Sequence, residues 1–134
     1  MKIIYKTDII PDVEEIIDLY NFSDYFPIKD KSDIERIVKM HRNANIVVTA
    51  WDRDKLIGLA RSISDFCYCC YLSDVCVRNE YKGKGIGAKL VKQTKQVAGD
   101  ECKLILQSSP NAMSFYLKIG MEQINSAFII QRSY

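Results

Sequence analysis

The sequence predicts an α/β protein in which helices flank both faces of a central mixed β-sheet. Apolar residues recur at helical spacing in four segments, and runs rich in β-branched and aromatic residues lie between them. The resulting order of elements is β-α-α-β-β-β-α-β-α-β-β. A mixed sheet with helices on both faces is the simplest packing for that order.

The first third of the chain is predicted to hold one strand and two helices. Residues 2–6 look like a strand, and Pro11 opens the first helix ahead of an acidic first turn. A polar and aromatic connection over residues 21–30 leads to the second helix. We expect Ser32 to cap that helix, because Glu35 follows it three residues later.

Strands and helices alternate in the rest of the chain. Three consecutive strands joined by short turns predict a meander, and a glycine-rich turn then leads into a third helix that Gly99 ends. A buried strand, a fourth helix and two last short strands follow. The predicted segments are 45–51, 56–63 and 66–77 for the meander, of which 66–77 is one longer strand or a bulged pair. They continue with 86–98 for the third helix, 103–107 for the buried strand, 110–119 for the fourth helix and 121–134 for the last two strands.

Length and composition indicate one globular domain over residues 1–134. The chain has 134 residues, of which 48% are hydrophobic, so it can bury a core. Its net charge of +2 and the lack of a basic stripe argue against a nucleic-acid partner. No run reaches the roughly 18 apolar residues that cross a membrane, and the N-terminus lacks the pattern of a signal peptide. We therefore expect a cytoplasmic protein with no membrane partner.

The five cysteines do not predict a metal site. Cys67 and Cys70 form a C-x-x-C, but they lie in an aromatic β pattern with no second pair at zinc-ribbon spacing. The single histidine, His41, is far away in sequence. We expect no bound metal, and we expect the cysteines to be small core or strand residues in a reducing compartment.

The turn Lys82–Gly87 is the strongest functional signal, because a strand precedes it and an amphipathic helix follows. Glycine lets the backbone approach a ligand, and the first amides of a helix have no partner within it. The turn lacks the Ser or Thr of a Walker loop and the spacing of a dinucleotide fold. A pyrophosphate held by amides without a metal remains, as in coenzyme A. A nucleotide is the alternative ligand.

Two motifs together resemble those of the GNAT superfamily of acyl-CoA-dependent N-acetyltransferases. The family's Gln/Arg-x-x-Gly-x-Gly/Ala motif is similar to Lys82–Gly87, with Lys82 in place of Gln or Arg. The later Phe-Tyr and Gly-Phe motif is similar to Phe115–Met121, in which Met121 replaces Phe. The resemblance covers nearly the whole chain in element order. It implies a single N-acetyltransferase domain with a mostly antiparallel mixed sheet of six to seven strands.

The resemblance also implies acetyl-CoA as co-substrate and gives it a place. The pantetheine arm would pair with an exposed strand edge formed by Val75, Cys76 and Val77. Ser109, Asn111 and Ser114 would meet the pantetheine or adenosine end. The pyrophosphate would take amides from Lys82, Gly83, Lys84, Gly85, Ile86, Gly87 and Ala88.

Two side chains are the candidates for proton transfer. Tyr116 would act in the family's manner as the general acid for the departing thiolate. Asp74 is the first candidate for the base that takes the proton of the amine, with Asp65 in the preceding turn as the other nearby carboxylate. The alternative is that Asp74 is a strand residue paired with Arg61 or Arg78. A backbone N–H around Val77, at the end of that strand, could hold the oxyanion.

The acceptor is predicted only as a class, the primary amine of a small molecule or peptide. An aromatic group lies where the family builds its acceptor pocket, and it could equally be plain core; it comprises Tyr20, Phe22, Tyr25 and Phe26, with Tyr68 and Tyr71 further on and Asp24 and Asp30 nearby. The last strand, 126–132, could pair between copies in a homodimer. A non-catalytic acyl-CoA-binding sensor or scaffold is the alternative to an enzyme.

Overall fold

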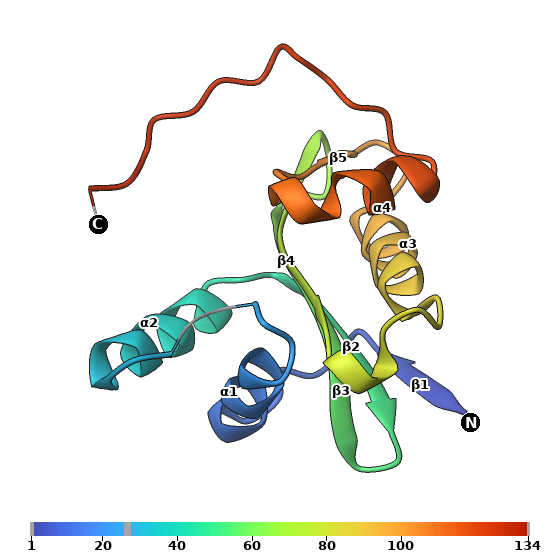
Figure 1. The fold of residues 1–134 in the computed structure, drawn as a ribbon. Helices are drawn as coiled ribbons and strands as arrows, with labels where there is room; N and C mark the ends of the chain where they lie inside the picture. The colour runs from blue at the N-terminus through green and yellow to red at the C-terminus, as the bar shows by residue number, and fades with distance from the viewer. Residues whose placement is uncertain (1, 26–27, 134) are drawn as a thin grey trace.

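The computed structural model describes residues 2–25 and 28–133, which fold around one mixed sheet with helices on both faces (Figure 1). The sheet has the order β1-β2-β3-β4-β5. Neighbouring strands are antiparallel from β1 to β4, whereas β4 and β5 are parallel. The elements are β1 (Ile3–Lys6), α1 (Val13–Asn21), α2 (Lys31–Arg42), β2 (Ile46–Asp52), β3 (Lys55–Ser64), β4 (Cys69–Val77), a 3-10 turn (Asn79–Tyr81), α3 (Ile86–Ala98), β5 (Lys103–Ile105), a second 3-10 turn (Pro110–Ala112) and α4 (Met113–Lys118).

The predicted cap of α2 is wrong by two residues. Asp30, not Ser32, is the N-cap, and its carboxylate accepts from the amides of Ser32 and Asp33 at 2.9 and 3.3 Å. The Asp33 carboxylate accepts in return from the amide of Asp30 at 3.4 Å, which completes a capping box. Asp30 and Asp33 therefore form the reciprocal side-chain to backbone hydrogen bonds of the capping box, which the sequence pattern had assigned to Ser32 and Glu35.

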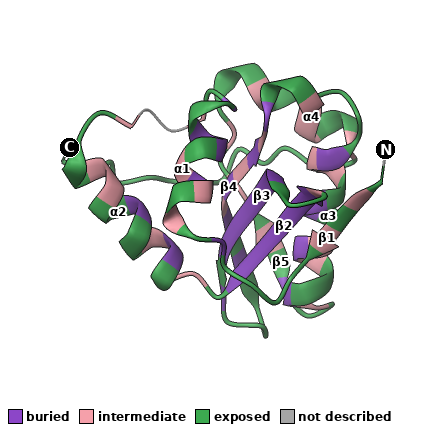
Figure 2. Ribbon diagram, turned by 90° about the horizontal axis from the view of Figure 1, so that it is seen from below, coloured by how far each residue is buried: buried purple, intermediate pink, exposed green. Residues whose placement is uncertain are grey.

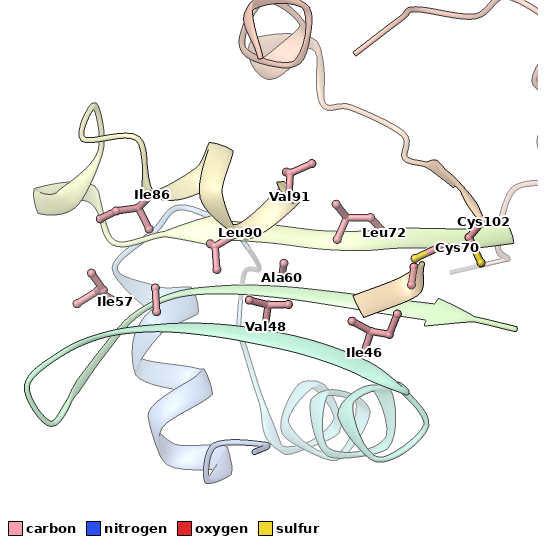
Figure 3. Close-up of a cluster of buried hydrophobic side chains, with 12 residues drawn as sticks. Ile46, Val48, Ile57, Ala60, Cys70, Leu72, Ile86, Leu90, Val91 and Cys102 are labelled. Carbon is pink, nitrogen blue, oxygen red and sulfur yellow. The ribbon is translucent and has the colours of Figure 1, made fainter. Parts of the chain in front are cut away.

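Two apolar clusters hold the layers together, one on each face of the sheet. On the α3 face, Ile86, Leu90 and Val91 pack over strand residues such as Val48 and Ile57 (Figure 3). On the other face, α1 and α2 cover the sheet, and the buried residues concentrate in β2, β3 and the inner sides of these helices (Figure 2). The members of that second cluster are Ile16, Leu19, Tyr20, Ile37, Val47, Trp51, Leu56, Leu59 and Cys76.

The cysteines are all free, and three of them are buried as small core residues. Cys67 and Cys69 instead lie exposed at the β3–β4 hairpin. Residues 2–25 and 28–133 contain no group of three or more side chains that could hold a metal ion. None of the helices in the same ranges is long and apolar enough to cross a bilayer.

The expected six to seven strands are not confirmed, because the sheet has five within the described residues. The two strands predicted over 121–134 do not form in the described part of that segment, up to residue 133. The amide of Met121 still donates to the carbonyl of Tyr116 at 3.1 Å, and beyond it the chain is extended and exposed. The tail leaves the body in an arc (Figure 1), so its β-prone residues meet no strand of this chain to pair with.

Candidate active site

β4 has an open edge, because β5 accompanies it over only part of its length. β4 pairs with β5 from Cys69 to Tyr71, whereas its pairing with β3 continues to Val77. The two parallel strands therefore separate after Tyr71. The rest of β4 has no strand on its β5 side within residues 2–25 and 28–133. An extended ligand could add there as an extra strand.

The backbone groups of Val75 and Val77 point out of this edge. The amide of Arg78 donates to the carbonyl of Ile57 at 2.8 Å, which marks a hydrogen-bonded pair of the antiparallel ladder. Such pairs alternate with pairs whose N–H and C=O groups point away from the partner strand. Val75 and Val77 occupy these outward positions, whereas Cys76 directs its backbone to β3 and its buried side chain to the α1 face.

A row of backbone amides without acceptors begins just beyond the end of β4. Gly83 and Gly85 have φ values of 79° and 81°, the left-handed region that glycine adopts without strain. The first amide of α3 with an acceptor is that of Lys89, which donates to Gly85 at 3.2 Å. In the described structure the amides from Gly83 to Ala88 donate to no protein group. They can therefore bind an anion at the positive end of the helix.

Lys82 belongs to this turn only in part. Its amide already donates to the carbonyl of Asn79 at 3.3 Å, and its Nζ donates to the carbonyl of Ser23 at 3.3 Å. Lys89 places its Nζ 5.3 Å from the ring centroid of Tyr5. The available groups of the turn are thus main-chain amides, with lysine charges around them.

The third glycine of the turn serves packing instead of turn geometry. Gly87 lies inside α3, and a Cβ on it would stand 3.1 Å from Cζ of Phe115. The Phe115 ring, which lies 5.0 Å from that of Tyr116 in an edge-on contact, therefore rests on the first turn of α3. This contact fixes α4 next to the row of free amides.

Tyr116 itself is half-buried on α4 against the α3-side core. Burial raises the pKa of its hydroxyl, so the phenol keeps its proton at neutral pH. The hydroxyl makes no hydrogen bond to any side chain or backbone group that the structure describes. Ser109 and Asn111 lie exposed between β5 and α4, and Ser114 lies exposed in the first turn of α4.

A β-bulge in β4 lies next to the point where β5 departs. Arg61 is opposite Asp74 and Ser62 is opposite Leu72, so Ser73 has no partner in β3. The bulge turns Asp74 to the α1 side of the sheet, where it is 3% exposed. Bulges of this kind re-aim side chains and often adjoin active sites.

Asp74 is the centre of a buried polar network. One carboxylate oxygen accepts from Arg61 Nε at 2.5 Å and from the hydroxyl of Tyr20 at 3.2 Å. The other accepts from the hydroxyl of Tyr25 at 2.5 Å and from that of Ser73 at 3.2 Å. Pairing with Arg61 matches one of the two alternatives from the sequence. The other arginine, Arg78, pairs with Asp18 of α1.

This network fixes the protonation of its members. Burial alone would raise the pKa of Asp74, but the hydrogen bond and charge of Arg61 outweigh it and lower that pKa. The pKa values of Tyr20 and Tyr25 are raised by burial and by the Asp74 charge, so both remain phenols. Burial, aided by the Arg61 charge, lowers the pKa of His41, 2.9 Å from the hydroxyl of Tyr20, to about 4.

Tyr25 brings the α1–α2 connection to the site. Its hydroxyl donates to the carbonyl of Ser73 at 3.1 Å as well as to Asp74, so the connection is tied to the bulge. Of the other aromatic candidates, Tyr20 is core, Phe22 is 59% exposed, and Phe26 lies outside the described residues. Sequence reasoning missed the link between Tyr25 and the bulge. The one signal was the polar pair Ser73–Asp74, which interrupts the apolar alternation of β4.

Of the three other carboxylates singled out near the site, Asp24 is exposed and accepts from the side-chain amide of Asn79 at 3.0 Å, and the other two act as caps. Asp65 accepts the amides of Cys67, Tyr68 and Cys69 with one oxygen, at 2.9, 2.7 and 3.0 Å. These hydrogen bonds lower its pKa to about 2. Asp30 caps α2. Neither carboxylate therefore has a free role as a base.

Comparisons with known proteins agree with this geometry. A family model described as an acetyltransferase (GNAT) domain matches residues 26–131. The thialysine N-epsilon-acetyltransferase of Bos taurus is 36% identical over 62 residues, which make up 42% of this chain and 36% of that protein. The uncharacterized N-acetyltransferase ycf52 of Pyropia yezoensis is 27% identical over 96 residues, or 67% of this chain and 55% of that protein. The matches thus span about a third to a half of these relatives.

A solved structure is similar over the whole length. A probable acetyltransferase of unknown function from meticillin-resistant Staphylococcus aureus superposes with a TM-score of 0.81 at 22% identity, and the match covers 99% of this chain and 100% of that one. At this identity the likeness shows the fold alone. The family model, however, matches most of the sequence. This chain belongs to the GNAT family of acetyltransferases.

Proposed function

We propose that this chain transfers the acetyl group of acetyl-CoA to a primary amine of a small molecule or peptide by direct attack. The observation that carries the proposal is the row of free amides from Gly83 to Ala88 beside the open edge of β4. The amides suit a pyrophosphate. The edge suits the amide-bearing arm that links the pyrophosphate to the thioester. No metal is needed for either contact.

The outward N–H groups of Val75 and Val77 have a second use in this proposal. When the amine attacks, a C–N bond forms, the C–S bond breaks, and negative charge develops on the carbonyl oxygen. An N–H fixed on a strand can stabilise that charge without reorganising. Val77, the residue expected from the sequence to lie near the oxyanion donor, has such a group.

The amine must lose a proton to attack and to form the product. A lysine-like amine has a pKa of roughly 10.4, so only about one molecule in a thousand is neutral at pH 7. Asp74 stays in the proposal as the candidate base next to the bulge, although the charge of its buried partner Arg61 balances its own. Its four donors and lowered pKa make it a weak base, so its proton transfer would run through water.

Tyr116 is proposed as the general acid that protonates the departing thiolate. Its raised pKa keeps the proton in place until the thiolate forms. Tyr116→Phe should lower kcat by about 10² to 10⁴, the usual range for a general acid, while coenzyme affinity hardly changes. Tyr81→Phe is the control, because that hydroxyl is bound to Asp52 at 2.6 Å, outside the site. Unchanged turnover in Tyr116→Phe would remove this residue from the mechanism.

An acceptor screen tests the proposal as a whole. The protein is mixed with acetyl-CoA and a panel of amines, and mass spectrometry follows a gain of about 42 Da, one acetyl group. The panel includes lysine-like amines, since one relative is named for acetylating thialysine. Coenzyme binding without any acetylated product would favour a sensor. Binding of ATP in place of coenzyme A would overturn the ligand assignment.

A further inference from the structure

The segment that follows α1 is held to β4 at both ends of the open edge. We call residues 22–25 the strap. At one end, the hydroxyl of Tyr25 donates to the carboxylate of Asp74 at 2.5 Å. At the other end, the carbonyl of Phe22 accepts from the amide of Asn79 at 2.8 Å. The strap therefore runs alongside the part of β4 that has no β5 partner (Figure 1).

Two side chains from beyond the end of β4 hold the middle of the strap. Nδ2 of Asn79 donates to the carboxylate of Asp24 at 3.0 Å. Nζ of Lys82 donates to the carbonyl of Ser23 at 3.3 Å. Asp24 has a φ of 57°, in the left-handed region that few residues other than glycine adopt. Such a conformation persists where the surrounding contacts determine it, so these contacts set the path of the strap.

Lys82 also complements the charge at the end of α1. The last carbonyls of a helix have no partner within it, and they form the negative end of the helix dipole. α1 has no basic residue in its last turn. Ser23 lies in the turn that ends this helix, and its amide donates back to the carbonyl of Tyr20 at 3.4 Å. The ammonium of Lys82 therefore supplies, from a distant part of the sequence, the cation that helix ends favour.

The two lysines on either side of Gly83 have different surroundings. The amide of Lys82 donates to the carbonyl of Asn79 at 3.3 Å, and its ammonium is directed to Ser23. Lys84 is exposed and makes no hydrogen bond or ion pair with any described residue. Lys82 therefore faces the strap, whereas Lys84 is available to an anion at the row of free amides.

We propose that Lys82 is a positioning residue for the acceptor: its ammonium fixes the strap, and the strap fixes Tyr25 beside Asp74. This rests on the proposed function, in which Asp74 is the candidate base and the amine is bound near it. Tyr25 would then border the amine. Removal of the Lys82 ammonium should weaken the binding of the amine more than that of the coenzyme, although this lysine belongs to the coenzyme turn.

Steady-state kinetics with the amine found in the acceptor screen separates the two sites. At saturating acetyl-CoA, Lys82→Met should raise KM for the amine about 10-fold, the low end for loss of a hydrogen bond to a charged group, and should change the coenzyme A dissociation constant by less than about threefold. Lys84→Met removes the same charge and should do the reverse. Asn79→Ala removes a strap contact without a change of charge, so it should raise the amine KM as well. Lys82→Arg keeps a donor and should restore the KM.

Hydrogen exchange tests the strap itself without acetyl transfer. The amides of Phe22 and Ser23 donate to carbonyls of α1 at 3.2 and 3.4 Å, so their exchange reports on the junction of helix and strap. In NMR measurements with no ligand present, both should exchange at least about fivefold faster in Lys82→Met. Their rates should not change in Lys84→Met or Lys82→Arg. The amides of β3 report global unfolding and should keep their rates in all three variants.

Unchanged exchange of the two strap amides in Lys82→Met would overturn the proposal. It would also be overturned by an amine KM that stays constant in that variant, or by a coenzyme dissociation constant that rises as much as in Lys84→Met. A failed acceptor screen would instead refute the proposed function, and the exchange measurement would still decide whether Lys82 holds the strap.

Discussion

Gly85→Ala tests the row of free amides most directly. Gly85 is the N-cap of α3, with φ 81° and ψ 7°, and open space surrounds the position where a Cβ would stand. The added methyl group therefore meets no side chain, and its whole effect is on the backbone. An L-residue in the left-handed region costs about 1–2 kcal/mol. Alanine also reduces the conformational entropy of the unfolded chain, which stabilises the folded state by about 0.4–1 kcal/mol. The net loss of folding stability should be about 1 kcal/mol.

The effect on coenzyme binding should be larger than this. The turn can relieve the strain by rotating the peptide groups on either side of residue 85, which moves their N–H groups away from the pyrophosphate. A hydrogen bond to a charged group contributes about 1.5–3 kcal/mol. Loss of one such bond raises the dissociation constant of coenzyme A about 10- to 150-fold. Isothermal titration calorimetry with coenzyme A measures this, and urea unfolding measures the loss of stability.

Gly99→Ala is a demanding control. Gly99 lies at the other end of α3, with φ 101° and ψ 169°, a region that is almost exclusive to glycine. Its backbone strain is at least as large, and nothing lies within 4 Å of its added Cβ. Coenzyme affinity should therefore survive in Gly99→Ala at temperatures where both variants are folded. Equal affinity in Gly85→Ala and the unaltered protein would refute the assignment of the phosphate site, and so would an equal loss in both variants.

Three further changes probe the surroundings of the site. In Gly87→Ala the new Cβ would lie 3.1 Å from the Phe115 ring, so this ring and α4 must shift. We expect kcat to fall by about 10²-fold and coenzyme affinity to change less. Steady-state kinetics measures kcat and KM separately. Tyr25→Phe removes a donor to Asp74, so urea unfolding should show a stability lower by about 1.5 kcal/mol. His41 has a folded pKa of about 4 against 6.5 in the unfolded chain, so the unfolded state binds more protons between these values and stability should fall by up to about 3 kcal/mol as pH drops from 6.5 to 4. It is the only histidine, so a His41→Gln variant that kept the full slope between pH 5 and 6.5 would contradict this assignment.

The order of elements up to α4 followed from the sequence because it depends on local patterns. The apolar spacing of α3 and its end at Gly99 needed no knowledge of distant residues, and the structure has both. The motif Lys82–Gly87 gave the place of the glycine turn for the same reason. It did not reveal that Gly83 and Gly85 shape the backbone while Gly87 accommodates Phe115, because that ring is far away in sequence.

The strands expected after Gly120 illustrate the limit of such patterns. Phe128, Ile129 and Ile130 have the composition of a strand, but a strand forms only where a partner offers its backbone. Whether that partner lies in the same chain is a property of the assembly. The sequence therefore predicted the preference of this segment for strand structure, and the described structure shows that no strand of the same chain pairs with it.

The bulge at Ser73 explains why the site could be located from the sequence but not assembled from it. Strict alternation along β4 would put Leu72 and Asp74 on the same face, in the α3-side core, where a carboxylate would have no partner. The extra residue reverses the alternation, so that Leu72 stays in that core while Asp74 faces Arg61 and the tyrosines. It comes only two residues after the last pair between β4 and β5. One irregularity therefore turns the carboxylate to the α1 side just past the point where the edge of β4 opens, which is the edge proposed to bind the acyl donor.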